Sequence, residues 1–108
     1  MAQSKPFYYD NGIVNASPYT IDWNNGEVQR IEVDPLIAGL VINFANPLTK
    51  GSIYVLEIIS NGLLVTFPLN VQWGAAGVPA LSAVNADLLN FYYNGNNYYG
   101  TYALDFVA

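Results

Sequence analysis

The 108-residue sequence contains no cysteine and no histidine. Without cysteine there is no disulfide framework, and without either residue the usual nucleophile–base pairs and zinc ligands are missing. The serine and threonine hydroxyls have no obvious side chain to activate them. We therefore predict that the protein is not an enzyme and that it needs neither a metal ion nor a cofactor.

Charge is scarce as well, and positive charge most of all. Only 10% of the residues are charged, against roughly 25% in a typical soluble domain. Three scattered cations, Lys5, Arg30 and Lys50, face eight carboxylates, which leaves a net charge of −5. Because such a chain repels a phosphate backbone, we expect no nucleic-acid partner. So few charges also mean that polar uncharged residues cover the surface, or that a partner hides part of it.

Long hydrophobic runs are also missing. The longest stretch of apolar residues and glycine, 36–42, is far too short to span a bilayer. The N-terminus lacks the apolar stretch that a secretory signal needs. We therefore expect a soluble, unprocessed protein with no membrane partner.

The carboxylates are the remaining groups that could carry chemistry. A pair of them could hydrolyse a glycosidic bond, but most lie beside turns or at outward strand positions, which is typical of solvated charges. Residues 22–27, "DWNNGE", resemble the start of a calcium loop. However, Gly26 comes one place early and no distant Glu completes the ligand set. A turn is the better interpretation of this segment.

What the sequence does contain is a regular rhythm of turns and short apolar runs. The runs are rich in Val, Ile, Tyr and Phe, and turn signals separate them at intervals of roughly a dozen residues, which is typical of a β-sandwich or barrel. We predict an all-β fold, an antiparallel, jelly-roll-like sandwich of about eight short strands over residues 19–108. The turn signals lie at 10–12, 24–26, 46–47, 61–62, 74–77 and 94–95.

The central turn predicts a hairpin. Asn61-Gly62 fits a two-residue type I′ turn, because both central residues of that turn have positive φ. The outer face of this hairpin would be more apolar than a solvated face, so we expect a second sheet or a neighbouring subunit to cover it. The expected pairs on the inner face are Ile58 with Val65, Leu56 with Phe67 and Tyr54 with Leu69, and the outer face would carry Ile53, Val55, Ile59 and Leu64.

The segment 91–102, "FYYNGNNYYGTY", predicts a second hairpin. A four-residue loop at 94–97 would place Phe91 opposite Gly100, and a two-residue Asn-Gly turn is the alternative register. In either case Tyr92 and Tyr99 are left for the outer face. Tyrosine has an apolar body and a polar tip, so it suits a surface that a partner covers. The alternative explanation is β-propensity alone.

Residues 1–18 lack a sustained strand pattern and carry two prolines. They predict either an extended N-terminal arm or a first edge strand at 7–9. The rings of Phe7, Tyr8 and Tyr9 are costly to leave in water. Together with Tyr92 and Tyr99 they form our candidate interface.

From Thr66 onward several short motifs follow one another in a set order, namely 66–68 (TFP), 71–74 (VQWG), 77–79 (GVP), Asp87, 91–95 (FYYNG), 98–100 (YYG) and Phe106. This order resembles a C-terminal pattern in small β-domains of tailed-bacteriophage virion proteins, namely head decoration (cement) proteins and tail-fibre modules. The sequence departs from that pattern in two places, since Asn94 stands where such sequences often have Asp, and Ala75-Ala76 interrupt the glycine pair expected after the Trp. Both departures weaken an assignment to a subfamily.

The resemblance implies a non-enzymatic structural protein of the virion, assembled in the host cytoplasm. Chain length favours a capsid decoration protein, because a fibre subunit normally needs a shaft or an anchor. We expect a homotrimer that binds the major capsid protein. The alternative is a tail-fibre or receptor-binding module that contacts host-surface carbohydrate. A free-standing carbohydrate-binding module is a third interpretation, and it requires an exposed row of rings such as Trp23, Tyr92 and Tyr99.

Overall fold

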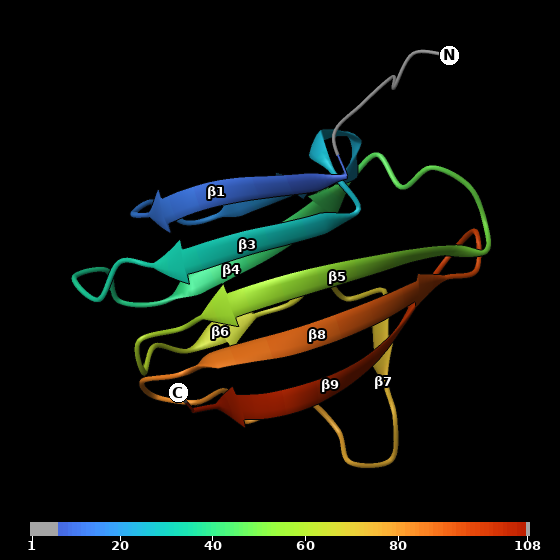
Figure 1. The fold of residues 1–108 in the computed structure, drawn as a ribbon. Coiled ribbons are helices and arrows are strands. Elements are labelled where there is room, and N and C mark those ends of the chain that lie inside the picture. Colours follow the sequence, from blue (N-terminus) through green and yellow to red (C-terminus); the bar gives the residue numbers. More distant parts are fainter. Residues whose placement is uncertain (1–6, 108) are drawn as a thin grey trace.

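The computed structural model describes residues 7–107, which form an all-β domain without α-helices (Figure 1). This confirms the predicted fold class at the level of secondary structure. A single 3-10 turn, η1 (Trp23–Asn25), follows the second strand. The strands are β1 (Tyr8–Val14), β2 (Tyr19–Asp22), β3 (Val28–Val33), β4 (Leu40–Ala45), β5 (Ser52–Ile59), β6 (Val65–Thr66), β7 (Val71–Trp73), β8 (Ala86–Tyr93) and β9 (Tyr98–Phe106).

The strands form a large sheet and a small sheet, and the chain alternates between them. The large sheet has the order β1-β3-β5-β8-β9-β7, and the small sheet has the order β2-β4-β6. Within each sheet the strands of β1 to β6 are parallel neighbours. The first six strands therefore make three stacked coils of a solenoid-like arrangement, each with one strand in either sheet. Figure 1 shows β4 and β6 behind the large sheet.

The antiparallel jelly-roll prediction is therefore wrong for this half of the chain. Antiparallel pairing is confined to β5 with β8 and β8 with β9, while β7 pairs in parallel with β9. The large sheet is thus mixed. The alternation of inward and outward side chains is the same in parallel and antiparallel strands, so it predicted the strands without predicting their partners.

The central turn has the predicted backbone but a different role. Asn61 and Gly62 have φ of 54° and 80°, as a type I′ turn requires. Instead of closing a hairpin, this corner sends the chain from β5 in the large sheet to β6 in the small one. The side chain of Asn61 fixes the corner by donating to the Val33 carbonyl at 2.8 Å. The predicted hairpin is therefore wrong.

The face assignment made with that hairpin holds for five of its six inner residues. Its one failure is Leu69, which is fully exposed. Ile53 and Leu64, expected on one outer face, are both exposed, but Ile53 lies in β5 of the large sheet and Leu64 directly precedes β6 of the small sheet. The five buried residues are Tyr54, Leu56, Ile58, Val65 and Phe67.

The second hairpin is confirmed in its four-residue register. Phe91 pairs with Gly100 across β8 and β9. The Asn94 side chain closes the loop by accepting hydrogen bonds from the amides of Asn96 and Asn97, at 2.9 and 2.7 Å. The ring that covers Gly100 comes from Trp73, and a Cβ at Gly100 would lie only 2.6 Å from it.

Residues 8–14 form the edge strand β1, so the edge-strand alternative describes them and an extended arm does not. Residues 1–6 of the expected arm lie outside the described part of the chain. The signal at 10–12, interpreted as a turn, is a bulge inside β1 where the register with β3 shifts. Gly12 takes a φ of 71° there, and its amide donates to Asp10 at 2.8 Å.

The core between the two sheets consists largely of aromatic rings in contact. Trp23 is stacked on Tyr54 with ring centroids 4.4 Å apart, and Phe44 meets Trp23 at 5.1 Å. Phe91 and Tyr98 extend the row toward the C-terminal hairpin. Such offset and edge-on ring pairs add to the stabilisation that buried apolar area provides. The rings therefore join the coils to the antiparallel end of the domain.

Candidate binding surface

Within residues 7–107, no other segment covers the outer face of the large sheet. The small sheet lies behind it, and no described segment crosses in front (Figure 1). Side chains of neighbouring strands lie in rows across this face because the strands are in register. The outward rows are Ile53, Tyr92, Tyr99 and Gln72; then Tyr8, Val28, Val55, Asn90 and Thr101; then Asp10, Arg30, Glu57, Leu88 and Ala103.

One end of the outer face is aromatic and apolar. Tyr92 and Tyr99 are cross-strand neighbours, with ring centroids 6.2 Å apart and ring planes inclined by only 11°. About half of each ring is exposed, and Ile53 beside them is 63% exposed. The Tyr99 hydroxyl accepts a hydrogen bond from the Asn94 side chain at 3.1 Å. We call Ile53, Tyr92 and Tyr99 the aromatic patch.

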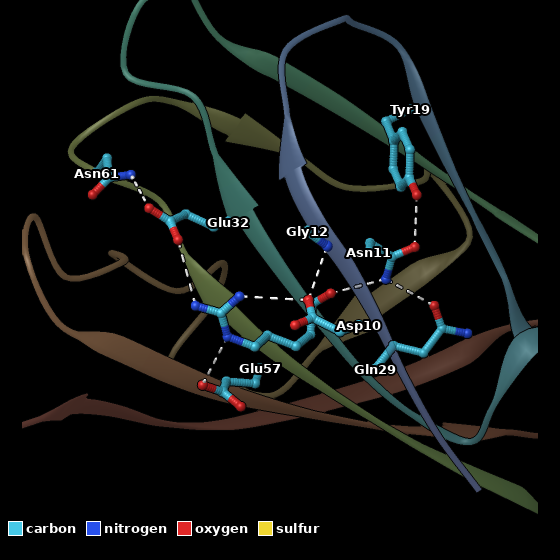
Figure 2. Close-up of polar contacts among 9 residues, drawn as sticks. Asp10, Asn11, Gly12, Tyr19, Gln29, Glu32, Glu57 and Asn61 are labelled. Atoms are coloured by element: carbon cyan, nitrogen blue, oxygen red, sulfur yellow. Dashed lines mark hydrogen bonds and ion pairs between the residues drawn. The ribbon is translucent and has the colours of Figure 1, made fainter. Parts of the chain in front are cut away.

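The half of the outer face formed by β1, β3 and β5 carries a charged cluster. The Arg30 guanidinium lies 3.5 Å from Asp10, 3.4 Å from Glu32 and 3.6 Å from Glu57. In Figure 2 these three carboxylates point toward a common centre. Partial burial works against the charge of Arg30, but the neighbouring carboxylates, led by Asp10, outweigh it and raise the pKa of Arg30 above its ordinary value. We call these four residues the Arg30 cluster.

The Arg30 cluster carries more negative than positive charge. Three carboxylates share one guanidinium, and the charged atoms lie at distances that are long for hydrogen bonds. The Asp10 side chain is half exposed. Ion pairs that are open to water in this way contribute little to stability. The cluster therefore presents carboxylate oxygens with spare capacity to a cationic or hydrogen-bond-donating partner.

A polar network holds β1 in place behind this face. The Asn11 side chain donates to Gln29 Oε1 at 3.0 Å and to the Arg30 carbonyl at 2.9 Å, and it accepts from the Tyr19 hydroxyl at 2.6 Å (Figure 2). Burial raises the pKa of Tyr19 above its ordinary value, and Tyr9 adds a smaller effect. Gln29 is fully buried. The network therefore positions Asp10 beside Arg30 from the inner side.

The predicted interface residues do not form one patch. Tyr92 and Tyr99 lie together, whereas Tyr8 is on the same face at the opposite edge of the sheet. Tyr9 pairs with Gln29 and belongs to the inner side of β1. Phe7 precedes β1 and is exposed. The structure therefore brings together only the tyrosine pair.

The row of three rings required for a carbohydrate-binding module is absent among residues 7–107. Trp23, the expected third ring, is fully buried in the core. Its indole nitrogen has no hydrogen-bond partner in the described part of the chain. The segment 22–27, which resembled a calcium loop, is instead the 3-10 turn, with Asp22 accepting from the Asn24 amide at 2.9 Å.

The sequence prediction missed the Arg30 cluster. Asp10 and Arg30 are 20 residues apart and become neighbours because β1 and β3 are parallel and in register. Glu57 follows Arg30 at a different interval, so the sequence has no fixed repeat that would reveal the row. A prediction of the parallel coils would have been needed to find it.

A second polar cluster lies where β8 begins and β9 ends. Buried Asp87 accepts from the Ser82 amide and from the Asp105 amide, both at 2.7 Å. Hydrogen bonds from Asn85 and Ser82 lower the pKa of Asp105, which has a φ of 67°. These contacts fix the irregular end of the hairpin.

Two further observations concern the described residues 7–107. No group of three or more potential ligands among His, Cys, Asp and Glu is arranged to hold a metal ion there. No helix in that part of the chain is long and apolar enough to cross a membrane.

Comparison of the chain with protein-family models, curated proteins and solved structures finds no match.

Proposed function

We propose that this chain is a non-enzymatic structural protein of a tailed-bacteriophage particle. In this proposal it is a capsid decoration protein that binds the major capsid protein and stabilises the head as a homo-oligomer. The observation that carries the proposal is the open outer face of the large sheet with its aromatic patch. Exposed apolar surface on an open sheet face is typical of protein–protein contacts. The sequence resemblance described above supports the virion setting.

The aromatic patch and the Arg30 cluster would contribute to binding in different ways. The aromatic patch supplies rigid apolar area with polar tips, which is the kind of surface that anchors interfaces. The Arg30 cluster supplies excess negative charge, which favours a partner with a cation opposite it and so sets orientation. We therefore expect the capsid surface to offer an apolar patch beside a Lys or Arg.

The fold changes how attachment is expected to occur. An extended arm of residues 1–18, one of the two predictions for this segment, could have been laid across the capsid. Since residues 8–14 are paired with β3 inside the sheet, we place the capsid contact on the folded outer face instead.

Binding to phage heads that lack this protein tests the proposal. We expect Tyr92→Ala/Tyr99→Ala to weaken binding by about 2 kcal/mol or more, as loss of central aromatic anchors does, while the melting temperature stays near that of the wild type. Leu36→Ala is the matched control, because Leu36 is 90% exposed in a loop away from this face. Full binding by the double variant would contradict the proposal.

A tail-fibre module that contacts host-surface carbohydrate is the second candidate function. The nearly parallel, half-exposed rings of Tyr92 and Tyr99 favour it, because sugars stack on such rings. Titration of the protein with host-surface glycans, followed by tyrosine fluorescence, separates the two functions. Saturable binding that Tyr92→Ala abolishes, without any binding to heads, would favour the fibre module.

A further inference from the structure

A long part of the chain carries no charge at all. Between Glu57 and Asp87, residues 58–86 include neither an acidic nor a basic side chain. This charge-free segment contains the end of β5, the corner at Asn61-Gly62, β6, β7 and the connection to β8. Its length is unexpected for a surface segment, because exposed connections are usually rich in charged and polar residues.

The charge-free segment lines an open groove beside β6. A hollow of about 360 Å³ is bounded by 64–69, Val71, Trp73 and Val78, and a second of about 270 Å³ adjoins it along 62–65 and 78–81. Every side chain in both linings is uncharged. Leu64 and Val78 are mostly exposed at the rim, and Leu69 is fully exposed.

The groove runs along an open strand edge. β6 pairs only with β4 and is the last strand of the small sheet. The large sheet continues past this level with β8, β9 and β7, so the small sheet ends three strands earlier. An edge strand beside exposed leucines is a surface to which another chain readily adds.

The distribution of charge indicates which chain fills the groove. Copies of a protein with a net charge of −5 repel one another. If two copies met through the outer face, their Arg30 clusters, each with two carboxylates in excess of its guanidinium, would face each other. Contact through the charge-free segment brings no like charges together.

We infer that a second copy of this chain occupies the β6 groove, so that the charge-free segments of neighbouring copies meet about the axis of the oligomer. Leu64, Leu69 and Val78 are the side chains that the contact buries. This inference rests on the homo-oligomer of the proposed function and assigns its contact surface. The outer face then stays free for a different partner.

Sedimentation equilibrium of the full chain at micromolar concentration tests this inference. We expect the wild type to be an oligomer and Leu69→Glu to associate at least about tenfold more weakly, because an unpaired charge would have to be buried in the contact. Leu36→Glu is the matched control, since it adds the same charge at a similarly exposed leucine. It should sediment as the wild type does.

Circular dichroism shows whether Leu69→Glu is folded. If that variant is unfolded, Leu64→Glu is measured in its place. A monomeric wild type, or a Leu69→Glu variant with unchanged association, overturns the inference. Tyr92→Ala/Tyr99→Ala should retain the wild-type mass. Loss of head binding in that variant, with the oligomer intact, concerns only the proposed function, so the two can fail separately.

Discussion

At the scale of single residues, the most informative contacts are those in which a small or polar group meets a ring. Gly100 lies flat against Trp73, and Tyr98 is enclosed between the sheets beside Trp23. The sequence placed Gly100 correctly opposite Phe91, because the hairpin loop sets that register. It did not indicate that the Trp73 ring covers Gly100, since the approach of Trp73 depends on how β7 pairs with β9.

Gly100→Ala should destabilise the protein by roughly 1–3 kcal/mol, because the added methyl would overlap the Trp73 ring in a packed interior. Gly74→Ala is the matched control, since a Cβ there meets nothing within 4 Å. Urea unfolding measures both free energies. Equal stability of the two variants would show that the Trp73 ring does not pack on Gly100.

Because Tyr98 is buried, we expect the free energy of unfolding to fall at high pH. Burial, opposed by a smaller effect of Trp23, raises the pKa of Tyr98 from 10.0 to about 12. Because the folded pKa lies above the unfolded one, this stabilisation is complete below pH 10 and is lost as the pH rises toward 12. Urea unfolding from pH 9 upward should therefore show stability falling across this interval, and Tyr98→Phe should reduce the fall.

At the scale of elements, alternation of side chains predicted what faces the core but not which strands pair. Tyr54, Leu56 and Ile58 are buried as expected. The signal at 10–12 was interpreted as a turn and is a bulge, and the signal at 61–62 was interpreted as a hairpin turn and is a corner between sheets. Local turn chemistry fixes backbone angles, whereas the destination of the next strand depends on packing across the whole domain.

Besides the ladder with β3, one side chain makes several of the contacts that attach β1. Asn11→Ala removes hydrogen bonds to Gln29, Arg30 and Tyr19 and leaves the buried Gln29 with fewer partners. We expect a loss of about 1–3 kcal/mol. Asn90→Ala, on the exposed outer face, is the control and should be close to neutral. Urea unfolding compares the two, and similar losses would contradict the role given to Asn11.

At the scale of the whole molecule, the three coils contact mainly their neighbours, as the repeats of a solenoid do. The first coil lies at the end of the stack. Each of its strands therefore pairs with a single neighbour, β1 with β3 and β2 with β4. The central strands β5 and β8 are each paired on both sides.

Hydrogen exchange should therefore be uneven along the chain. Amides of β1 and β2 should exchange faster than those of β5 and β8, because an end coil opens without disturbing the middle. Mass spectrometry of peptides from exchanged protein resolves these segments. Uniform protection across all four strands would instead indicate that the domain opens as one unit.

The parallel coils also have a consequence for the order in which the protein can form while it is being synthesised. Within residues 7–107, β8 and β9 are the sole pair of neighbours in a sheet that also follow each other in the chain. Every other pairing closes a long loop, which slows its formation. The most quickly formed element thus leaves the ribosome after the seven strands that precede it in the chain. We infer that the large sheet, in which β5 pairs with β8, is completed only once this hairpin has emerged.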